Sequence, residues 1–455
     1  MNTPFVGRKE ELAELEDAYA SDIFEFAVLY GRRRIGKTSL VSEFCKDKRT
    51  VFFASEMGSE AMALAKLSQS VSSLSKSKVS LSFASFGDIL TYIADLATEE
   101  RLVFVIDEFP YFAQSLPSAM STLQHAIDHV LKPTKLMVIL LGSSVHFMQQ
   151  DVLGLQSPLY GRRTRQIFLQ SFSVQETKNL CKRSDLDAVI VQTITGGVPL
   201  YVEYFASDVL LMDEIHRLFF RKSGLLYHEP FALLSMESRT PGMYSQVLEI
   251  LASGTTKPSV IADKMQSSSA NIASILKTLE TLGIVEKKLP FGQKNSRKGV
   301  WSICDDLFSF HSRFVAPYTS LIELGKVDGI LALVSDQLNQ YVGKKFEAIC
   351  HRYFLQHTQR PVVAIGHWWG FDHALKREEE LDLVAKDAHG NFSFGECKWS
   401  DKAVGKAELD LLKRRSYLVG EAKNPDFWLF SKSGFTKGIV EEGNIHLVGL
   451  EELFS

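Results

Sequence analysis

One short stretch of the sequence combines glycine, lysine and threonine at a spacing that suits phosphate binding. The apolar run FEFAVLY is followed by Gly31-x-x-x-x-Gly36-Lys37-Thr38 and then by SLVSEFCK, which favours a helix. Glycines at this spacing let backbone N–H groups wrap a phosphate, while the lysine reaches the terminal phosphates and the threonine hydroxyl binds Mg²⁺. A surface loop would need this order by accident. The pattern therefore predicts an ATP·Mg²⁺ site that also includes Ser39.

Carboxylates and hydroxyls follow two later apolar runs. RLVFVIDEF ends in Asp107 and Glu108, where a Mg²⁺ ligand and a water-activating carboxylate belong behind such a loop. KLMVILLGSS ends in Ser143 and Ser144. We expect Ser143 to contact the γ-phosphate or the attacking water if its strand lies between the other two.

A second group of chemical residues occurs in EELDLVAKDAHGNFSFGECKW, residues 379–399. Asp382 interrupts an apolar run, and alternation puts Glu396 and Lys398 on one face of the next strand. Because unpaired buried charges are costly, we expect Asp382 and Glu396 to share a Mg²⁺ ion, with Lys398 orienting the attacking water. Glu347, on a preceding helix, would complete the metal shell. A surface ion pair is the alternative for Glu396 and Lys398.

Two further segments of the first half bear on the nucleotide site. SPLYGRRTRQIFL places Arg162 and Arg163 just before a strand, where an arginine could reach the γ-phosphate of a neighbouring subunit or simply be solvated. TGGVPLYVEYF, with Gly197 and Pro199, is consistent with a lid helix, although proline at a helix start explains much of it.

The middle of the chain, residues 241–303, predicts three helices and a pair of strands, the order of a winged helix. Its third helix ends at Gly283 and offers only Lys277 for DNA, which disfavours a sequence-reading transcription regulator. The wing is richer in basic residues that suit phosphate contacts. These are Lys287, Lys288, Lys294, Arg297 and Lys298. A solvated hairpin used for packing is the alternative.

The last third predicts a helix, three strands, a helix and a strand. The segments are NQYVGKKFEAICHRYFLQH, VVAIGHWWG, LDLVA, FSFGECKW, KAELDLLKRRSYLVG and DFWLFSK. Five histidines lie in this region, and without cysteine partners or i, i+4 spacing they are interpreted as packing or surface residues rather than a zinc site. They are His351, His357, His367, His373 and His389.

Length and composition limit the remaining possibilities. A chain of 455 residues suggests about three domains, and a net charge of −3 requires any nucleic-acid-binding surface to be local. The five cysteines show no metal or disulfide spacing, which is typical of a reducing compartment. No apolar run is long enough to span a bilayer. We therefore expect a cytoplasmic protein without membrane contact.

The order of the motifs resembles the archaeal-type ATPases of the AAA+/STAND group. The resemblance rests on FVGRKEELAEL, YGRRRIGKTSL, VIDEFPYF, LLGSS, SPLYGRR and GGVPLYV. It implies that Gly7 and Arg8 lie near the adenine base and that Gly197 and Pro199 belong to a lid. One large subgroup carries a winged helix and a C-terminal domain of the PD-(D/E)xK nuclease type.

The C-terminal third resembles that nuclease-type domain in several motifs. The matching residues are Glu347, Trp368, Trp369, Asp382, Glu396 and Lys398. Leu381 stands where the motif's name has proline, so the full signature is not present.

The whole chain is thus predicted to be a multidomain α/β protein. The expected parts are a P-loop ATPase core (1–170), a helical lid (171–238), a winged helix (239–320) and a restriction-endonuclease-like domain (325–455). The expected function is ATP hydrolysis coupled to a DNA-directed, Mg²⁺-dependent nuclease in a homo-oligomer. The resemblance implies a role in defence or mobile-DNA maintenance. The alternative is an ATPase switch or scaffold whose C-terminal fold only binds nucleic acid or protein.

Overall fold

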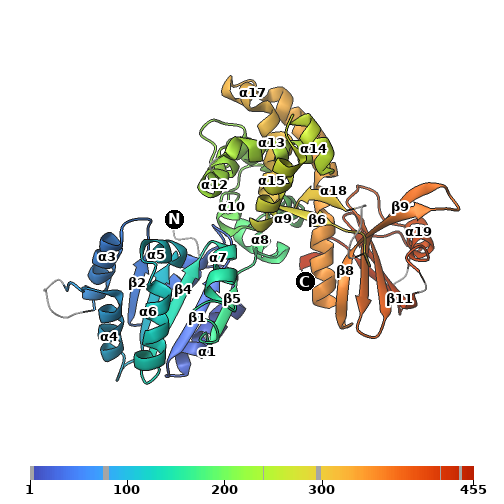
Figure 1. Cartoon of the computed structure of the whole chain (residues 1–455). Coiled ribbons are helices and arrows are strands. Elements are labelled where there is room, and N and C mark those ends of the chain that lie inside the picture. The colour runs from blue at the N-terminus through green and yellow to red at the C-terminus, as the bar shows by residue number, and fades with distance from the viewer. Residues whose placement is uncertain are drawn as a thin grey trace. The chain divides into compact units, whose positions relative to one another are not determined.

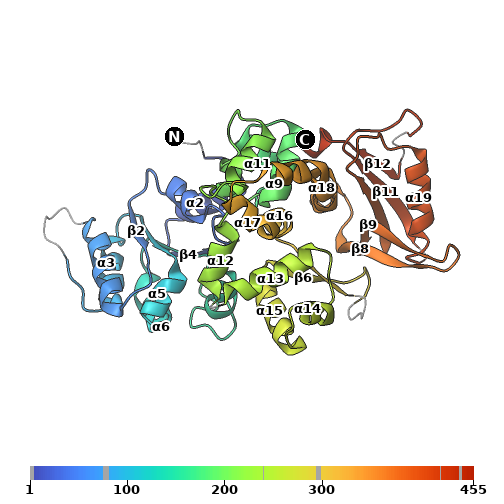
Figure 2. The same ribbon diagram turned by 90° about the horizontal axis from the view of Figure 1, so that it is seen from above.

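A computed structural model describes residues 5–74, 81–238, 240–293, 299–420, 422–439 and 443–454 (Figures 1 and 2). The chain divides into two compact units. One contains residues 1–171 and 198–200, and the other contains residues 172–197 and 201–455. Within the described ranges, no helix is both long enough and apolar enough to cross a membrane.

The first unit is built on a parallel sheet of five strands in the order β2-β3-β4-β1-β5. The strands are β1 (Glu25–Tyr30), β2 (Thr50–Ala54), β3 (Leu102–Asp107), β4 (Leu136–Gly142) and β5 (Arg165–Phe168). Every residue of β1, β3 and β4 is buried, as expected for a parallel sheet covered on both faces. The predicted parallel sheet is confirmed, and β4 does lie between β3 and β1.

Helices of the first unit flank this sheet (Figure 1). They are α1 (Lys9–Ala20), α2 (Lys37–Phe44), α3 (Glu60–Ser72), α4 (Phe86–Leu96), α5 (Phe109–Ser115), α6 (Ala119–Ala126), η1 (Ile127–Leu131), α7 (Val145–Phe147) and η2 (Met148–Val152). The core joins alternate strand residues such as Phe104 and Val138 to apolar residues of α3, α4 and α6. This packing sets the strand ends, and therefore the loops that follow them, in a fixed order.

The second unit begins with a helical region. Its helices are α8 (Val174–Cys181), α9 (Asp185–Thr195), α10 (Pro199–Glu203), α11 (Leu211–Phe219) and α12 (Glu229–Glu237), with the first residues of α10 belonging to the first unit. Ser173 begins α8 with a capping box closed by Glu176. Gly196 ends α9 with a φ of 64°, a left-handed conformation that glycine adopts without strain.

Three helices and a hairpin follow, as the sequence predicts. They are α13 (Pro241–Ala252), α14 (Pro258–Lys264), α15 (Ser269–Thr281) and the antiparallel strands β6 (Val285–Lys288) and β7 (Val300–Ile303). Their shared core includes Val247, Ile261 and Leu276. Lys294, Arg297 and Lys298, three of the predicted wing residues, lie outside the described residues.

A long helix connects this region to the last sheet. After α16 (Asp306–Phe314), η3 (Ala316–Tyr318) and α17 (Thr319–Glu323), the helix α18 (Asp328–His357) runs for 30 residues and starts earlier than NQYVGKKFEAICHRYFLQH predicts. The Tyr341 hydroxyl lies 3.1 Å from the Thr193 carbonyl oxygen, and Arg352 donates to the Phe172 carbonyl. The helix α18 is therefore packed against the helical region as well as against the last sheet.

The last sheet is mixed and has the strand order β12-β11-β10-β9-β8. Its elements are β8 (Val362–Asp372), β9 (Arg377–Asp387), β10 (Asn391–Lys398), α19 (Lys406–Ser416), β11 (Lys423–Ser431), β12 (Ile445–Val448) and η4 (Glu452–Phe454). The strands β8, β9 and β10 pair antiparallel, whereas β10, β11 and β12 pair parallel. The predicted succession of elements is present, and β12 extends it.

Candidate functional site

The glycine loop of the first unit lies between β1 and the first turn of α2, which begins at Lys37. A Cβ atom at Gly31 would lie 2.6 Å from the Leu169 carbonyl oxygen, so a larger residue does not fit there. Gly36 has a φ of 88°, which glycine adopts without strain. The backbone therefore turns sharply and presents the N-terminus of a helix, the geometry that binds phosphate groups.

Lys37 and Thr38 carry the polar atoms of this loop. The Lys37 ammonium donates to the Gly31 and Arg32 carbonyl oxygens at 3.0 Å each. Burial lowers the pKa of Lys37 to about 8, although the Glu108 and Asp107 carboxylates oppose that shift. A bound phosphate would raise the pKa of Lys37 again, because its negative charge favours the ammonium form.

Asp107 joins the end of β3 to the loop. Its Oδ2 accepts from the Thr38 hydroxyl at 2.7 Å, and its Oδ1 accepts from the Glu108 backbone N–H at 2.8 Å. Burial raises the pKa of Asp107, while the Thr38 hydrogen bond lowers it. Thr38 and Asp107 supply oxygen atoms of the kind that Mg²⁺ prefers, so they fit the predicted ion.

Glu108 stands at the start of α5 in a left-handed conformation, with a φ of 51°. Its Oε2 accepts from the Ser143 hydroxyl at 2.7 Å. This contact exists because β4 is the neighbour of β3 in the sheet. Ser144 instead caps α7 through the Phe147 N–H.

Gly7 and Arg8, which the family resemblance places near the adenine, lie beside the glycine loop. Arg8 donates to the Ile35 carbonyl at 3.1 Å and to the Gln170 carbonyl at 2.7 Å, and it is buried. The arginine thus ties the loop backbone to the segment after β5. Gly7 precedes it with a φ of 71°. Their placement near the adenine stays a prediction.

Other predicted nucleotide contacts are placed as follows. Pro199 lies against the loop, since a Cβ at Gly36 would be 3.9 Å from its Cγ. Gly197 has a φ of 67° and lies against the Phe172 carbonyl, where no side chain fits. Ser39 is exposed on α2.

Arg162, the candidate finger, forms a forked ion pair with Asp128 of its own chain, with Nη2 2.6 Å from Oδ2. Its finger role therefore stays a prediction and would require that pair to open.

Arg33 is a residue of this site that the sequence analysis missed. Its guanidinium donates to the Tyr111 hydroxyl at 2.6 Å and lies over the ring of that tyrosine. The run of three arginines in YGRRRIG is the only signal for it in the sequence. The contact holds a cation beside the loop and next to the strand end that carries Glu108.

The second candidate site lies in the last sheet, where a β-bulge positions Asp382. Gly366 and Trp368 of β8 pair with Val384 and Leu381 of β9, so β9 has one extra residue between them. Bulges of this kind re-aim side chains and are common beside active sites. The Asp382 Oδ2 accepts from the Cys397 N–H at 2.8 Å on the neighbouring β10.

Three carboxylates approach one another around this bulge. Burial and the nearby Glu396 charge raise the pKa of Asp382 to about 7. Burial and the Asp382 charge raise the pKa of Glu347 to about 8. The structure therefore brings together the acidic residues that the sequence singles out, on α18, β9 and β10. They form an acidic group in which the charge of one carboxylate disfavours the charge of the next.

Lys398 and Arg415 provide the adjacent positive charge. The Lys398 ammonium donates to Glu396 Oε1 at 2.5 Å. Burial opposes its charge, but the Glu396 carboxylate raises the pKa of Lys398 overall. Arg415 of α19 lies 3.4 Å from Glu396 and donates to Glu379 at 2.7 Å. The sequence analysis did not predict a role for Arg415.

Two histidines interpreted as packing or surface residues lie against the carboxylates. The His351 Nε2 is 2.7 Å from the Asp382 carbonyl oxygen, and the His367 Nδ1 is 3.4 Å from Glu347 Oε2. Their rings are 4.7 Å apart. His351 follows Glu347 by one helical turn, which is the sequence signal that could have suggested this placement.

The chemistry of the donors fits a divalent cation, but the side chains do not already form a cage. Burial and neighbouring carboxylates raise the pKa of a metal-binding carboxylate, and a bound cation lowers it again. The raised pKa values of Asp382 and Glu347 therefore suit a cation site. As the side chains stand in the described part of the chain, no three histidine, cysteine or acidic residues are grouped closely enough to hold a metal ion. Binding would require Glu347, Asp382 and Glu396 to turn toward one another.

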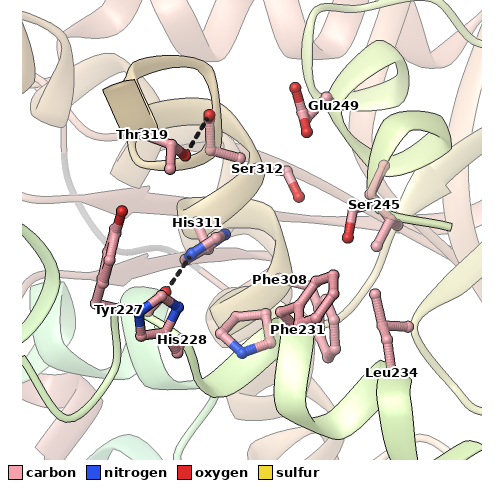
Figure 3. Close-up of a pocket in the computed structure, with 13 residues that line it drawn as sticks. Tyr227, His228, Phe231, Leu234, Ser245, Glu249, Phe308, His311, Ser312 and Thr319 are labelled. Atoms are coloured by element: carbon pink, nitrogen blue, oxygen red, sulfur yellow. Dashed lines mark hydrogen bonds between the residues drawn. The ribbon is translucent and has the colours of Figure 1, made fainter. Parts of the chain in front are cut away.

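A separate pocket occurs between α12, α13, α16 and α17 of the second unit (Figure 3). Its volume is about 180 Å³. The His311 Nε2–H donates to the Tyr227 carbonyl oxygen at 2.8 Å, and burial lowers the pKa of His311 to about 4. Glu249 and Ser245 also line the pocket. No motif of the sequence indicated it.

The glycine loop, the paired acidic residues and the parallel sheet define an ATPase of the P-loop class. Residues 5–205 match the model of an ATPase domain found predominantly in Archaea, and residues 311–410 match DUF234, a family described as archaeal and bacterial proteins of unknown function. The chain is therefore similar to archaeal P-loop ATPase domains over residues 5–205 and to DUF234 proteins over residues 311–410.

Particular relatives share parts or most of this arrangement. The chain is 29% identical over 427 residues to an uncharacterised protein of Methanocaldococcus jannaschii, covering 91% of this chain and 92% of that one. It is also 47% identical to an uncharacterised ATP-binding protein of that organism over 45 residues. That match covers 10% of this chain and 76% of the other protein. The Walker-type ATPase of Pyrococcus abyssi has a similar fold, with a TM-score of 0.52 and 18% identity. The match covers 69% of this chain and 97% of that ATPase.

Proposed function

We propose that this protein hydrolyses ATP in its first unit and thereby controls a DNA-directed, Mg²⁺-dependent nuclease in its last sheet. The observation that carries the nuclease proposal is the meeting of Asp382, Glu396 and Glu347 beside Lys398. Buried carboxylates that face one another are costly unless a cation compensates them, so this group suits a bound divalent ion.

In the ATPase reaction the residues of the first unit have separate roles. Lys37 would leave the carbonyl oxygens that it now contacts and bind the β- and γ-phosphates, while Thr38 and Asp107 hold Mg²⁺. Glu108 would orient the attacking water, and Ser143 would hold the Glu108 carboxylate in place. When bound, the ion would neutralise charge that develops on the phosphate oxygens.

In the nuclease reaction the sheet would supply the corresponding groups. Asp382 and Glu396 would hold the divalent ion, with Glu347 from α18 as a further ligand. When bound, that ion would act as a Lewis acid at the scissile phosphate and lower the pKa of water. Lys398 would orient the attacking water and stabilise the negative charge of the pentacovalent phosphorus centre.

The helices α13–α15 and the β6–β7 hairpin support the proposal of a winged helix. The order of the elements, the shared core and the hairpin after the third helix all suit it. In this proposal the winged helix and the helical region carry the nucleotide state to the last sheet. The lid, winged-helix and nuclease-like boundaries remain those expected from the sequence.

Cleavage of plasmid and single-stranded DNA in Mg²⁺ or Mn²⁺ tests the nuclease part. The wild-type chain should cut, whereas Lys398→Ala should lose at least about a hundredfold in rate while still binding the ion. Lys406→Ala is the control, because this exposed lysine of α19 lies on the same helix as Arg415 but outside the cluster.

Calorimetric titration of the full chain with Mn²⁺ completes the test. Asp382→Asn should weaken binding, and Lys398→Ala should not. If wild type, Asp382→Asn and Lys398→Ala all bind the ion alike, or none binds it, the cluster is structural. The second candidate function would then stand, an ATPase switch whose last domain only binds nucleic acid or protein.

A further inference from the structure

The β6–β7 hairpin does not project freely from its three helices. The Phe291 N–H, just after β6, donates to the His367 carbonyl of β8 at 2.8 Å. The Phe291 ring meets the Phe392 ring edge-on, with centroids 6.3 Å apart, and packs against the core of the last sheet. A backbone hydrogen bond to β8 and a partly buried aromatic contact with β10 thus fasten the hairpin to the last sheet.

The anchor lies next to the carboxylate cluster. His367, which accepts the backbone bond, also contacts Glu347 through its ring, with Nδ1 3.4 Å from Oε2. Gly366 precedes it, and a Cβ there would lie 3.8 Å from the Phe291 ring. The hairpin therefore contacts His367, and His367 in turn contacts Glu347 of the proposed metal site.

Lys288, the last residue of β6, stands three residues before this anchor. Burial and Asp382 raise the pKa of Glu347, whereas the Lys288 charge lowers it. Burial lowers the pKa of His351 and of His367, and Lys288 lowers each further. The hairpin also contacts α18 directly, because the Lys345 ammonium, two residues before Glu347, donates to the Ile303 carbonyl of β7 at 3.2 Å. The one ion pair of Lys288 among the described residues is a long one, 3.5 Å to Glu286, and its side chain is 39% exposed.

Lys287 provides an internal comparison. Successive residues of a strand point to opposite faces, so Lys287 and Lys288 cannot both face the cluster. Lys287 pairs with Trp301 across the hairpin and is exposed. Two lysines that look equivalent in the sequence are therefore on different sides of the hairpin.

We propose that the hairpin is part of the C-terminal site, where Lys288 binds a backbone phosphate of the nucleic acid next to the carboxylates. The inference rests on the proposed nuclease function for its substrate class. In a freely projecting wing Lys288 would have no fixed position. Here the hydrogen bond from Phe291 to His367 of β8 sets the position of Lys288. Lys288 is a substrate-positioning residue in this account, because its long side chain reaches solvent beside the cluster and is not committed to a close ion pair.

The test compares Lys288→Ala with Lys287→Ala in the full chain. With Ca²⁺ in place of Mg²⁺ to prevent cleavage, Lys288→Ala should weaken binding of a 30-base-pair duplex and reduce the slope of log K against log salt by about 0.9. In cleavage, Lys288→Ala should raise the KM for DNA at least about threefold with a smaller effect on kcat. Lys287→Ala should change the KM less.

A measurement without DNA keeps the inference separate from the nuclease proposal. Removing the Lys288 charge should tighten Mn²⁺ binding roughly fivefold, because the ammonium repels a cation at the carboxylates, and Lys287→Ala should do so much less. Phe291→Ala should reproduce part of this tightening and Phe291→Leu less, with an unchanged urea-unfolding curve of the full chain showing that it is folded.

The outcomes separate the two proposals. A wild-type chain that binds Mn²⁺ but does not cut DNA ends the nuclease proposal, and the two lysine variants then still decide whether the hairpin belongs to the site. Equal effects of Lys287→Ala and Lys288→Ala on Mn²⁺ affinity, or no effect of either, overturn the inference even if wild type cleaves DNA.

Discussion

At the scale of single residues, Glu108 shows how the fold prepares a side chain. Its left-handed backbone conformation costs of the order of 1 kcal/mol for a residue other than glycine, and such strain persists where the surroundings impose it. The Asp107 carboxylate holds the Glu108 N–H, and the Ser143 hydroxyl holds the side chain. Glu108 is thereby kept at the strand end next to the phosphate loop.

Substitutions at the loop should separate binding from turnover. Lys37→Ala should abolish ATP binding, because it removes the buried ammonium beside the phosphates. Glu108→Gln should retain binding and lose about a hundredfold or more in turnover, since an amide cannot accept the proton of water. Nucleotide titration and phosphate release measure the two effects.

Glu99→Gln, an exposed change nine residues earlier in the chain, is the control for this pair. Hydrolysis at the wild-type rate in Glu108→Gln would show that another group positions the water.

The carboxylate cluster is a second case at this scale. Asp382, Glu347 and Glu396 are distant in the sequence, and each has a different polar neighbour, namely the Cys397 N–H, His367 and Lys398. Burial keeps His367 neutral by lowering its pKa, so it does not offset the charge of Glu347. Burial and Asp382 therefore raise the pKa of Glu347 to about 8, although the Lys288 charge opposes that shift.

At the scale of elements, the helices α12, α13, α16 and α17 enclose a pocket with a histidine that cannot easily become charged (Figure 3). His311 of α16 is hydrogen-bonded to the Tyr227 carbonyl, and burial lowers its pKa to about 4. His228 lowers the pKa of His311 further, whereas the Tyr227 carbonyl raises it. Glu249 lies on the opposite wall, with its own pKa raised by burial.

The pocket gives stability a defined dependence on pH. Between about pH 6.5 and pH 4 the unfolded chain binds a proton on His311 that the folded chain does not bind. The contribution of this histidine is therefore present above pH 6.5 and is lost as pH falls toward 4, by of the order of 2 kcal/mol.

His311→Gln should reduce that slope, because glutamine can still donate to the Tyr227 carbonyl but does not titrate. Urea unfolding at pH 7, 6, 5 and 4 measures the difference, with exposed His146→Gln as the matched change. An unaltered slope in His311→Gln would assign the acid sensitivity to other groups.

The helix α18 matters at the same scale, because it serves two regions of the second unit. Its first half contacts the helical region through Tyr341, and its second half presents Glu347 and His351 to the last sheet. A fragment that begins at 325 would expose the Tyr341 side of this helix. The last sheet therefore keeps its native contacts only in the full chain.

At the scale of the whole molecule, the ATPase site and the carboxylate cluster belong to different compact units. Lys398→Ala should for this reason leave basal ATP hydrolysis within about twofold of wild type, since Lys398 contacts only residues of its own unit among its described partners.

If the nucleotide state controls the nuclease, Glu108→Gln with ATP bound should alter the cleavage rate, whereas Lys398→Ala should not alter hydrolysis. Parallel assays of both activities on both variants give the answer. Equal cleavage by Glu108→Gln and wild type, with and without ATP, would mean that the two activities are uncoupled.

Patterns of neighbouring residues predict the local elements of this chain and the types of chemistry that they carry. The glycine loop between a strand and a helix, the Asp107-Glu108 strand end, the three helices with a hairpin and the succession of elements in the last third are all local patterns. They are readable because the spacing of glycines and the period of apolar residues depend only on neighbours in the chain. Roles in catalysis remained predictions, since a motif names a chemistry and not a substrate.

Which of these groups lie together depends on long-range packing. The order of the parallel strands brings Ser143 to Glu108, a bulge in β9 turns Asp382 toward Cys397, and the docking of Phe291 on β8 places Lys288 near Glu347. His351 and His367 join the cluster for the same reason. Sheet order, register and docking are set by long-range packing of many side chains at once, and no local pattern of residues records them.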